Sequence, residues 1–279
     1  PSYPIHAFGF IMAGGVIRSV KAHSPEEYLS GLGRAYAHSV PPPMAMIVCY
    51  PANPTAQTVD LDFYKEVVRF AKAHDLIVIS DMAYSEIYFD DNRPPPSILE
   101  VDGAKDIAVE VNTLSKTYSM AGFRVGWAAG NARLIAALAR VKSYLDYGAY
   151  TPIQVAAAAA LNGPQECVAE MRGIYRSRRD AMLDAFAKAG WTLPTPDASM
   201  FVWAPLPAGF EAMGSLEFSK QLVEQAGVAV APGVGFGEHG EGFVRLALVE
   251  NEQRIRQAAR AVKKFLGDHK KAGQPTAAE

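Results

Sequence analysis

Apolar runs of strand length alternate with segments of helical period through the first half of this chain. The expected strands are residues 46–50, 76–80, 107–111 and 126–130. The expected helices among them are residues 25–39, 61–74 and 132–145. Strands that are buried on both faces and joined by helices read as continuous apolar runs, whereas half-exposed antiparallel strands alternate polar and apolar residues. The pattern therefore predicts an α/β fold with a mostly parallel sheet.

The second half of the chain has a different pattern. Pro164 opens a long helical segment that ends near Ala189, just before a glycine. Short strands are expected at residues 200–203, 228–230 and 243–248, with helices at 216–226 and 252–266. We therefore expect a large domain over residues 1–163, a smaller α+β domain over 164–269, and a disordered polar tail over 270–279.

The composition favours a globular protein that acts on small molecules. Of 279 residues, 49% are hydrophobic and 20% are charged, and the formal net charge is −2. This balance offers no basic stripe for nucleic acid, so no nucleic-acid partner is expected. The longest apolar run, residues 151–161, is far shorter than the roughly 20 residues of a membrane span, so we interpret it as a buried helix and expect no membrane partner.

The cysteines favour a reducing compartment. Cys49 and Cys167 are the two cysteines of the chain, too few for a disulfide framework, and neither lies in a cluster with metal-site spacing. The chain begins without a charged segment followed by an apolar one, so no signal peptide is expected. These features predict a cytoplasmic protein without a metal site.

Polar side chains follow the apolar runs at the places where open parallel sheets bind ligands. Asp81 could pair with a pyridine nitrogen, although aspartate also caps turns. Tyr84 and Asn53 could both bond the phenolate oxygen of the same ring, but a buried tyrosine often bonds a carbonyl and Asn-Pro is a plain turn signal. Arg245 could hold a substrate carboxylate with two parallel bonds, or lie on a half-exposed strand face.

Lys116 and Arg124 lie eight residues apart in the segment from Ser115 to Trp127. A lysine that forms an imine must give up its ammonium proton, and a neighbouring cation favours the neutral amine. Arg124 can be that cation while it binds a phosphate. The cofactor that requires both an imine and a phosphate clamp is pyridoxal 5'-phosphate. Taken alone, such a pair is usually a solvated lysine and a surface arginine.

Together, these motifs resemble those of the class I/II aminotransferases. The resemblance lies in Asn-Pro-Thr, Asp-x-x-Tyr, Ser-Lys followed by arginine, and a late arginine. It implies the roles above for Asn53, Asp81, Tyr84, Lys116, Arg124 and Arg245. It further implies that Thr113 contacts the phosphate and that Tyr3 stacks on the pyridine face. The implied fold is the type I fold of pyridoxal-phosphate-dependent transferases.

A narrower resemblance is to bacterial glutamate–pyruvate (alanine) aminotransferases and the LL-diaminopimelate aminotransferase-like group. It rests on residues 2–6, 53–57, 142–148 and 213–218 and extends to about Leu266. Members of this group carry a long segment before the position of Pro1, with a phosphate-binding loop. The resemblance therefore implies a fragment without full activity, from a protein that forms a homodimer through the aromatic segment 144–150.

The implied reaction is transamination between an L-amino acid, with alanine and glutamate favoured, and a 2-oxo acid. LL-diaminopimelate, aspartate and methionine aminotransferases of the same family are alternatives. The neighbourhood of Tyr147 and Tyr150 offers no second arginine of the kind that aspartate-specific relatives use. A lyase, decarboxylase or synthase would need the same residues, since the cofactor fixes them. A cofactor-binding regulator domain is a further alternative of a different class.

Overall fold

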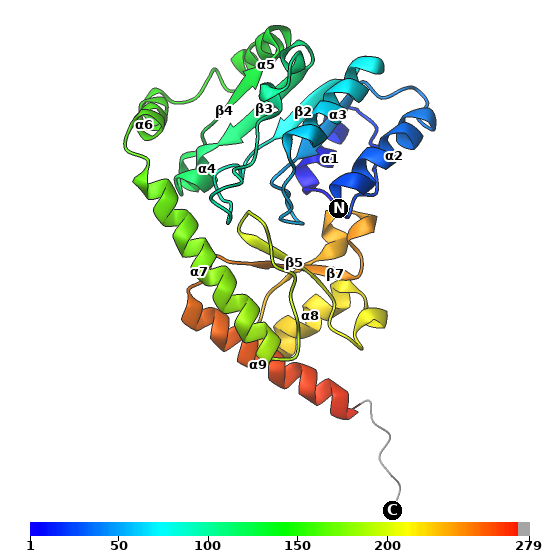
Figure 1. Ribbon diagram of the computed structural model, residues 1–279, viewed down its shortest axis with the longest axis vertical. Helices are drawn as coiled ribbons and strands as arrows, with labels where there is room; N and C mark the ends of the chain where they lie inside the picture. The colour runs from blue at the N-terminus through cyan, green and yellow to red at the C-terminus, as the bar shows by residue number, and fades with distance from the viewer. Residues whose placement is uncertain (273–279) are drawn as a thin grey trace, which may run out of the picture.

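The computed structural model describes residues 1–272, which form two sheet-containing units, one above the other in Figure 1. The upper sheet has the order β1-β2-β3-β4. Its strands are β1 (Ala45–Cys49), β2 (Ile77–Asp81), β3 (Ala108–Thr113) and β4 (Gly126–Gly130). The pairs β1–β2 and β2–β3 are parallel, and β4 runs antiparallel to β3. The prediction of a mostly parallel α/β sheet is confirmed.

Helix α3 (Leu61–Ala73) covers one face of this sheet for reasons that are visible in its sequence. The Asp60 side chain accepts the amide N–H of Phe63, which caps the helix. Apolar residues recur at helical spacing on one side, and Tyr64 and Val67 are fully buried. They pack in one cluster with strand residues such as Val78. This cluster fixes the position of the strand ends.

Two more helices precede β1. Helix α2 (Pro25–Ala37) was expected, and the Ser24 side chain caps it by accepting the amide N–H of Glu27. Helix α1 (Pro4–Met12) was not expected. Its sequence is apolar almost throughout and has no helical period, and none of its residues is buried. The sequence signal that does exist is Pro4 at the first helical position.

The segment after β3 carries three helices. Helix α4 (Leu114–Thr117) follows β3 directly, and α5 (Ala132–Leu145) and α6 (Thr151–Asn162) follow β4. The interpretation of residues 151–161 as a buried helix is wrong for this structure, because Ala157 is the one buried residue of α6. Ile153, Ala156 and Ala160 are partly buried, and the other side chains of this helix are exposed. The apolar side of α5 is likewise exposed at Leu138 and Val141.

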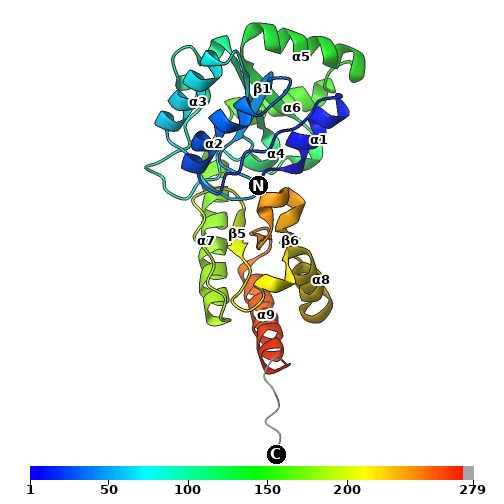
Figure 2. The same ribbon diagram turned by 90° about the vertical axis from the view of Figure 1, so that its right-hand side faces the viewer.

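The lower unit combines a small antiparallel sheet with three helices (Figures 1 and 2). The sheet has the order β5-β7-β6, formed by β5 (Phe201–Pro205), β6 (Ala231–Pro232) and β7 (Phe243–Ala247). The helices are α7 (Glu166–Lys188), α8 (Ser215–Ala226) and α9 (Glu252–Ala272). A strand was expected at residues 228–230. The short β6 instead begins one residue later, because pairing with β7 begins at Ala231.

Short 3-10 helices complete the described fold. They span Ile98–Glu100, Ala104–Asp106, Ala121–Phe123, Glu211–Met213, Gly233–Phe236 and Glu238–Gly240. Helix α9 includes residues 270–272 of the expected tail, since lysine and alanine favour continuation of a helix. Residues 273–279 of that tail lie outside the described residues. The division at residue 163 stays a prediction. Over residues 1–272, no helix is long and apolar enough to cross a membrane.

Backbone contacts join the two units beside β2. The amide of Ser199 donates to the carbonyl of Ile87 at 2.7 Å, and the amide of Phe89 donates to the carbonyl of Asp197 at 3.1 Å. Residues 84–89 directly follow β2 of the upper unit, yet their side chains Tyr84, Ile87 and Phe89 pack into the core of the lower unit. This arrangement brings β7 toward the ends of β1 and β2.

Phe218 on α8 is the residue whose truncation should most weaken the lower core. It is fully buried, and its ring meets those of Trp191, Phe210 and Phe265 at 5.5–6.0 Å. We expect Phe218→Ala to lower the free energy of unfolding by about 3–5 kcal/mol, because it opens a cavity among aromatic rings. Urea titration of the wild type and the variant measures this change. Leu216→Ala on the exposed side of α8 is the control, expected within about 0.5 kcal/mol of the wild type.

Candidate active site

A cavity of about 240 Å³ lies where the three parallel strands end. Asp81 is the last residue of β2 and Thr113 the last of β3, while Asn53 follows β1. Seven of the eight side chains proposed from the sequence line this cavity, namely Tyr3, Asn53, Asp81, Tyr84, Thr113, Lys116 and Arg124. Ala83, Ser115 and Ala121 complete the lining. The structure thus brings these residues together at one edge of the sheet.

Lys116 reaches the cavity from the short helix α4. The Thr113 hydroxyl caps this helix by accepting the amide N–H of Ser115 at 3.1 Å. Lys116 is half-buried, and its Nζ lies 5.9 Å from the centroid of the Tyr84 ring. It takes part in none of the ion pairs among the described residues. An amine held in this way is available for chemistry on a bound molecule.

Asp81 is held by two donors. Its Oδ1 accepts the amide N–H of Ala83 at 3.0 Å, and its Oδ2 accepts from Nε2 of His6 at 2.8 Å. The side chains of His6 and Asp81 are 12% and 20% exposed, so the carboxylate keeps one edge open to the cavity. His6 is a site residue that the sequence reasoning missed. The available signal was its position three residues after Tyr3, where a helix places both on one side.

Tyr3 precedes α1 and meets the His6 ring edge-on, with ring centroids 5.9 Å apart. The Tyr3 side chain is half exposed, and it lines the cavity next to Asp81. Tyr3 therefore offers an aromatic neighbour, and Asp81 a carboxylate neighbour, to a flat ring bound in the cavity.

Hydroxyl groups and a guanidinium gather at another part of the cavity. The Thr113 hydroxyl lies 2.9 Å from the Ser115 hydroxyl. Arg124 is exposed and donates from Nη1 to the carbonyl of Ala121 at 3.0 Å, which leaves its other donors free for a ligand. Ser115 directly precedes Lys116, and its hydroxyl is a second donor beside that of Thr113. This set of donors suits a phosphate.

Arg245 is the one proposed residue that does not line the cavity, but it touches a residue that does. Its Nη1 donates to Oδ1 of Asn53 at 2.6 Å. Its guanidinium carbon lies 4.0 Å from the centroid of the Phe201 ring and 4.7 Å from that of Phe236. Burial lowers the pKa of Arg245, yet an arginine remains protonated. Its Nε is buried without a partner among the described residues, and it is a donor suited to an acid ligand.

Tyr84 is buried beside Phe201, and its hydroxyl is not ionised. Burial raises its pKa above the ordinary value, and the nearby Arg245 opposes this shift only in part. The hydroxyl therefore remains a hydrogen-bond donor over the physiological range. Asn53 is 5% exposed and lines the same cavity. Two neutral polar groups are thus available for a ring oxygen.

The chemistry of these side chains fits pyridoxal 5'-phosphate. Lys116 supplies an amine that has no ion-pair partner within residues 1–272, and Asp81 a carboxylate for the ring nitrogen. Arg124 can bind the phosphate with Thr113 and Ser115, Asn53 and Tyr84 can bind the ring oxygen, and Tyr3 can lie on a ring face. These are the groups through which a protein binds and tunes this cofactor. The orphaned Nε of Arg245 is left for the carboxylate of a substrate.

Comparisons with known proteins agree with this geometry. Residues 1–262 match the family model described as aminotransferase class I and II. The chain is 64% identical to the putative aminotransferase AatC of Rhizobium meliloti, over 95% of this chain and 65% of that protein. It is 50% identical to the glutamate-pyruvate aminotransferase AlaC of Escherichia coli, over 94% of this chain and 64% of that protein. Identity to the LL-diaminopimelate aminotransferase of Moorella thermoacetica is 42%, over 96% of this chain and 67% of that protein.

The solved structure of an aromatic aminotransferase from Pyrococcus horikoshii OT3 superposes on this chain with a TM-score of 0.89 and 29% identity. The superposition covers 97% of this chain and 72% of that one, which confirms the fold expected from the motifs. The chain spans 64% to 67% of the length of the three sequence relatives. From the family match and these identities, the chain belongs to the class I and II aminotransferases.

Proposed function

We propose that the protein transfers an amino group between an L-amino acid and a 2-oxo acid with pyridoxal 5'-phosphate as cofactor. The observation that carries the proposal is the gathering of Lys116, Asp81 and Arg124 on one cavity at the strand ends. The bound cofactor supplies an electron sink for the substrate's α-carbon. The proposed division of the chain is a cofactor-binding unit over residues 1–163 and a smaller unit over 164–269.

Each side chain has a separate task in this proposal. Lys116 would hold the cofactor until the substrate amine replaces it. The freed amine would then move a proton between the α-carbon of the substrate and the reacting carbon of the cofactor. Asp81 keeps a proton on the ring nitrogen, and His6 holds the Asp81 carboxylate in place. Arg245 orients the substrate carboxylate through two parallel bonds.

For the substrate, we propose alanine and glutamate as amino donors. The support is the similarity to AlaC, whose name states glutamate–pyruvate transfer. The second candidate is LL-diaminopimelate, because the Moorella thermoacetica relative carries that name at lower identity. A lyase on the same side chains, and a cofactor-binding regulator, are less favoured. All the named relatives reported above are aminotransferases.

We further propose a cytoplasmic homodimer. Cys49 and Cys167 are both free thiols, as in a reducing compartment. Tyr144, Tyr147 and Tyr150 are more than 70% exposed, and exposed aromatic residues that gather in one segment are typical of protein interfaces. Sedimentation of the purified protein tests the dimer. An active monomer would contradict it.

The experiment that tests the reaction combines two readouts. The purified protein is loaded with pyridoxal 5'-phosphate, mixed with L-alanine and 2-oxoglutarate, and followed by cofactor absorbance and by pyruvate formation. Amination of the cofactor with release of pyruvate supports alanine transamination. Turnover with LL-diaminopimelate and none with alanine would select the second candidate. Cleavage products without any amino transfer would indicate a lyase.

The ring of Phe236 should affect substrate binding through Arg245. Phe236→Leu keeps an apolar side chain but removes the ring from the guanidinium. The lost cation–π contact should raise the KM for the amino acid about 2–10-fold and change kcat by less than about twofold. Initial rates at varied amino acid measure both constants. Phe70→Leu on α3, where the ring packs on Tyr36 and His74, is the control. A fall in kcat without a change in KM would contradict this positioning role.

A further inference from the structure

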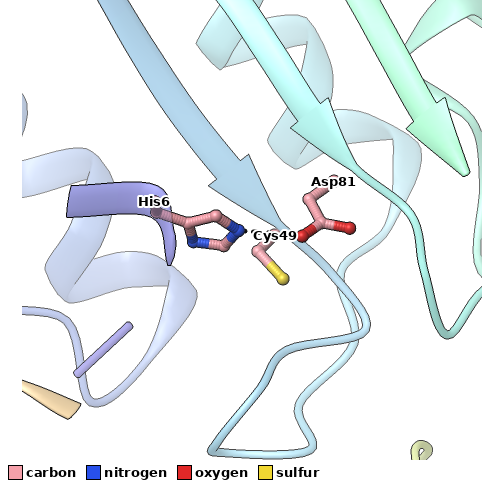
Figure 3. A group of neighbouring side chains, drawn as sticks. All are labelled: His6, Cys49 and Asp81. Carbon is pink, nitrogen blue, oxygen red and sulfur yellow. Dashed lines mark hydrogen bonds and ion pairs between the residues drawn. The ribbon is translucent and has the colours of Figure 1, made fainter. Parts of the chain in front are cut away.

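Three metal-ligating groups meet beneath the proposed cofactor site, although they are far apart in the sequence. Figure 3 shows His6 of α1 pointing toward the ends of β1 and β2, where Cys49 and Asp81 lie. Cys49 and Asp81 are the last residues of these strands and are partners in the parallel register. One ligand atom from each of the three side chains lies within 4.8 Å of the other two. The spacing of these residues in the sequence does not indicate this group, because the pairing of β1 with β2 brings Cys49 and Asp81 together and α1 adds His6.

The separations are close to those that a tetrahedral ion requires. With bonds of about 2.0–2.1 Å to nitrogen or oxygen and about 2.3 Å to sulfur, neighbouring ligands of a tetrahedral Zn²⁺ lie about 3.3–3.6 Å apart. Here His6 Nε2 and Asp81 Oδ2 are 2.8 Å apart, and the separations that involve the Cys49 sulfur are at most 4.8 Å. Changes of about 1 Å in these separations would bring all three into this range.

The ligand types select the ion. A thiolate and an imidazole favour a borderline or soft ion such as Zn²⁺, whereas Mg²⁺ and Ca²⁺ prefer oxygen ligands throughout. Three protein ligands leave one tetrahedral position free, as in zinc sites that exchange a water or a small molecule. The two anionic ligands balance the charge of a divalent ion, and this limits the cost of placing it in a half-buried position.

We propose that the cofactor-free protein binds one Zn²⁺ ion through His6 Nε2, Cys49 Sγ and Asp81. On binding, the Cys49 thiol releases its proton to solvent. The His6 imidazole gives up the Nε2 proton that Asp81 accepts in the metal-free protein and takes one from solvent on Nδ1, so it binds the ion as a neutral ligand. The positive charges of Lys116 and Arg124, which line the cavity together with Asp81, oppose the binding of the ion.

The ion and the cofactor should exclude each other. The Asp81 carboxylate cannot be a metal ligand and the partner of a protonated ring nitrogen at the same time. This part of the inference rests on the proposed function, whereas metal binding itself does not. Zn²⁺ would then act as an inhibitor of cofactor loading. The loaded enzyme would bind Zn²⁺ more weakly at this position.

Cobalt provides a direct readout of the sulfur ligand. The cofactor-free protein is titrated with Co²⁺ and the near-ultraviolet thiolate-to-cobalt charge-transfer band is recorded, and Zn²⁺ is then added to displace it. We expect one ion per chain. Cys49→Ser should remove the band and weaken Zn²⁺ binding roughly tenfold or more, because one of three ligands loses its thiolate. Cys167→Ser is the matched control, since Cys167 is the other thiol of the chain and is exposed on α7.

The outcomes separate this inference from the proposed function. A band that persists in Cys49→Ser, or that disappears in Cys167→Ser, overturns the site. Failure of the wild-type protein to bind Co²⁺ also overturns it. Circular dichroism of the wild type and both variants checks that all three are folded alike. Loading with pyridoxal 5'-phosphate, followed by its own absorbance, should weaken Zn²⁺ binding roughly tenfold or more. Simultaneous binding of both overturns the exclusion. Failure of the cofactor to load, with the cobalt band intact, would instead contradict the proposed function.

Discussion

Lys116→Ala is expected to abolish turnover, with a fall in kcat of about 10⁴-fold or more, because the variant loses the covalent link to the cofactor and the base that moves the α-proton. The cofactor should still bind through Arg124, Asp81 and the hydroxyl groups around Thr113. Its absorbance should then be that of the free aldehyde instead of an imine. Assays of pyruvate formation and an absorbance spectrum of the loaded variant measure the two effects.

The control for this prediction is Lys65→Ala. Lys65 is exposed on α3 and pairs with Asp62, far from the cavity, so its loss should leave kcat unchanged. Turnover by Lys116→Ala close to the wild-type rate would show that the lysine has no catalytic part. An imine spectrum in that variant would point to another amine of the chain.

Asp81→Asn should have the second largest effect, a fall in kcat of about 10²–10⁴-fold. An asparagine cannot supply the negative charge that keeps a proton on the ring nitrogen, so the ring would accept electrons poorly. The amide keeps the size of the carboxylate and can still meet His6, which now lies 2.8 Å from Oδ2. Single-turnover rates of cofactor amination test this step apart from product release.

Asp62→Asn serves as the control, because this aspartate lies in the first turn of α3 and is exposed. It should leave the rate of cofactor amination unaltered. If Asp81→Asn retains the wild-type amination rate while it binds the cofactor normally, then the carboxylate does not support the ring nitrogen. The assignment of Asp81 would be wrong in that case.

The sequence predicted the upper sheet well, because buried parallel strands are apolar along their whole length. Its residues Val48 and Val78 are almost fully buried, as the apolar runs indicated. The strand-end rule indicated Asn53, Asp81 and Tyr84, which line one cavity, without any knowledge of their distances, whereas Thr113 was expected from the family resemblance alone. Residues near a strand end can thus be brought together by topology alone.

What the sequence did not reveal depends on packing between distant segments. Helix α1 lacks a helical period, so neither the helix nor the contact from His6 to Asp81 could be inferred from spacing. The start of β6 is set by its pairing with β7, which residues 228–230 do not encode. The exposure of α6 is likewise a property of what surrounds it and not of its alanine-rich sequence.

The contact between Arg245 and Asn53 joins residues that are 192 positions apart. All the cavity-lining side chains come from residues 3–124, whereas the proposed carboxylate clamp comes from β7 near the end of the fold. During synthesis on a ribosome, the cavity-lining segment therefore emerges long before the clamp does. The side chains that line the cavity and the guanidinium beside them therefore come from separate parts of the chain, which only folding of the lower unit onto residues 84–89 brings together.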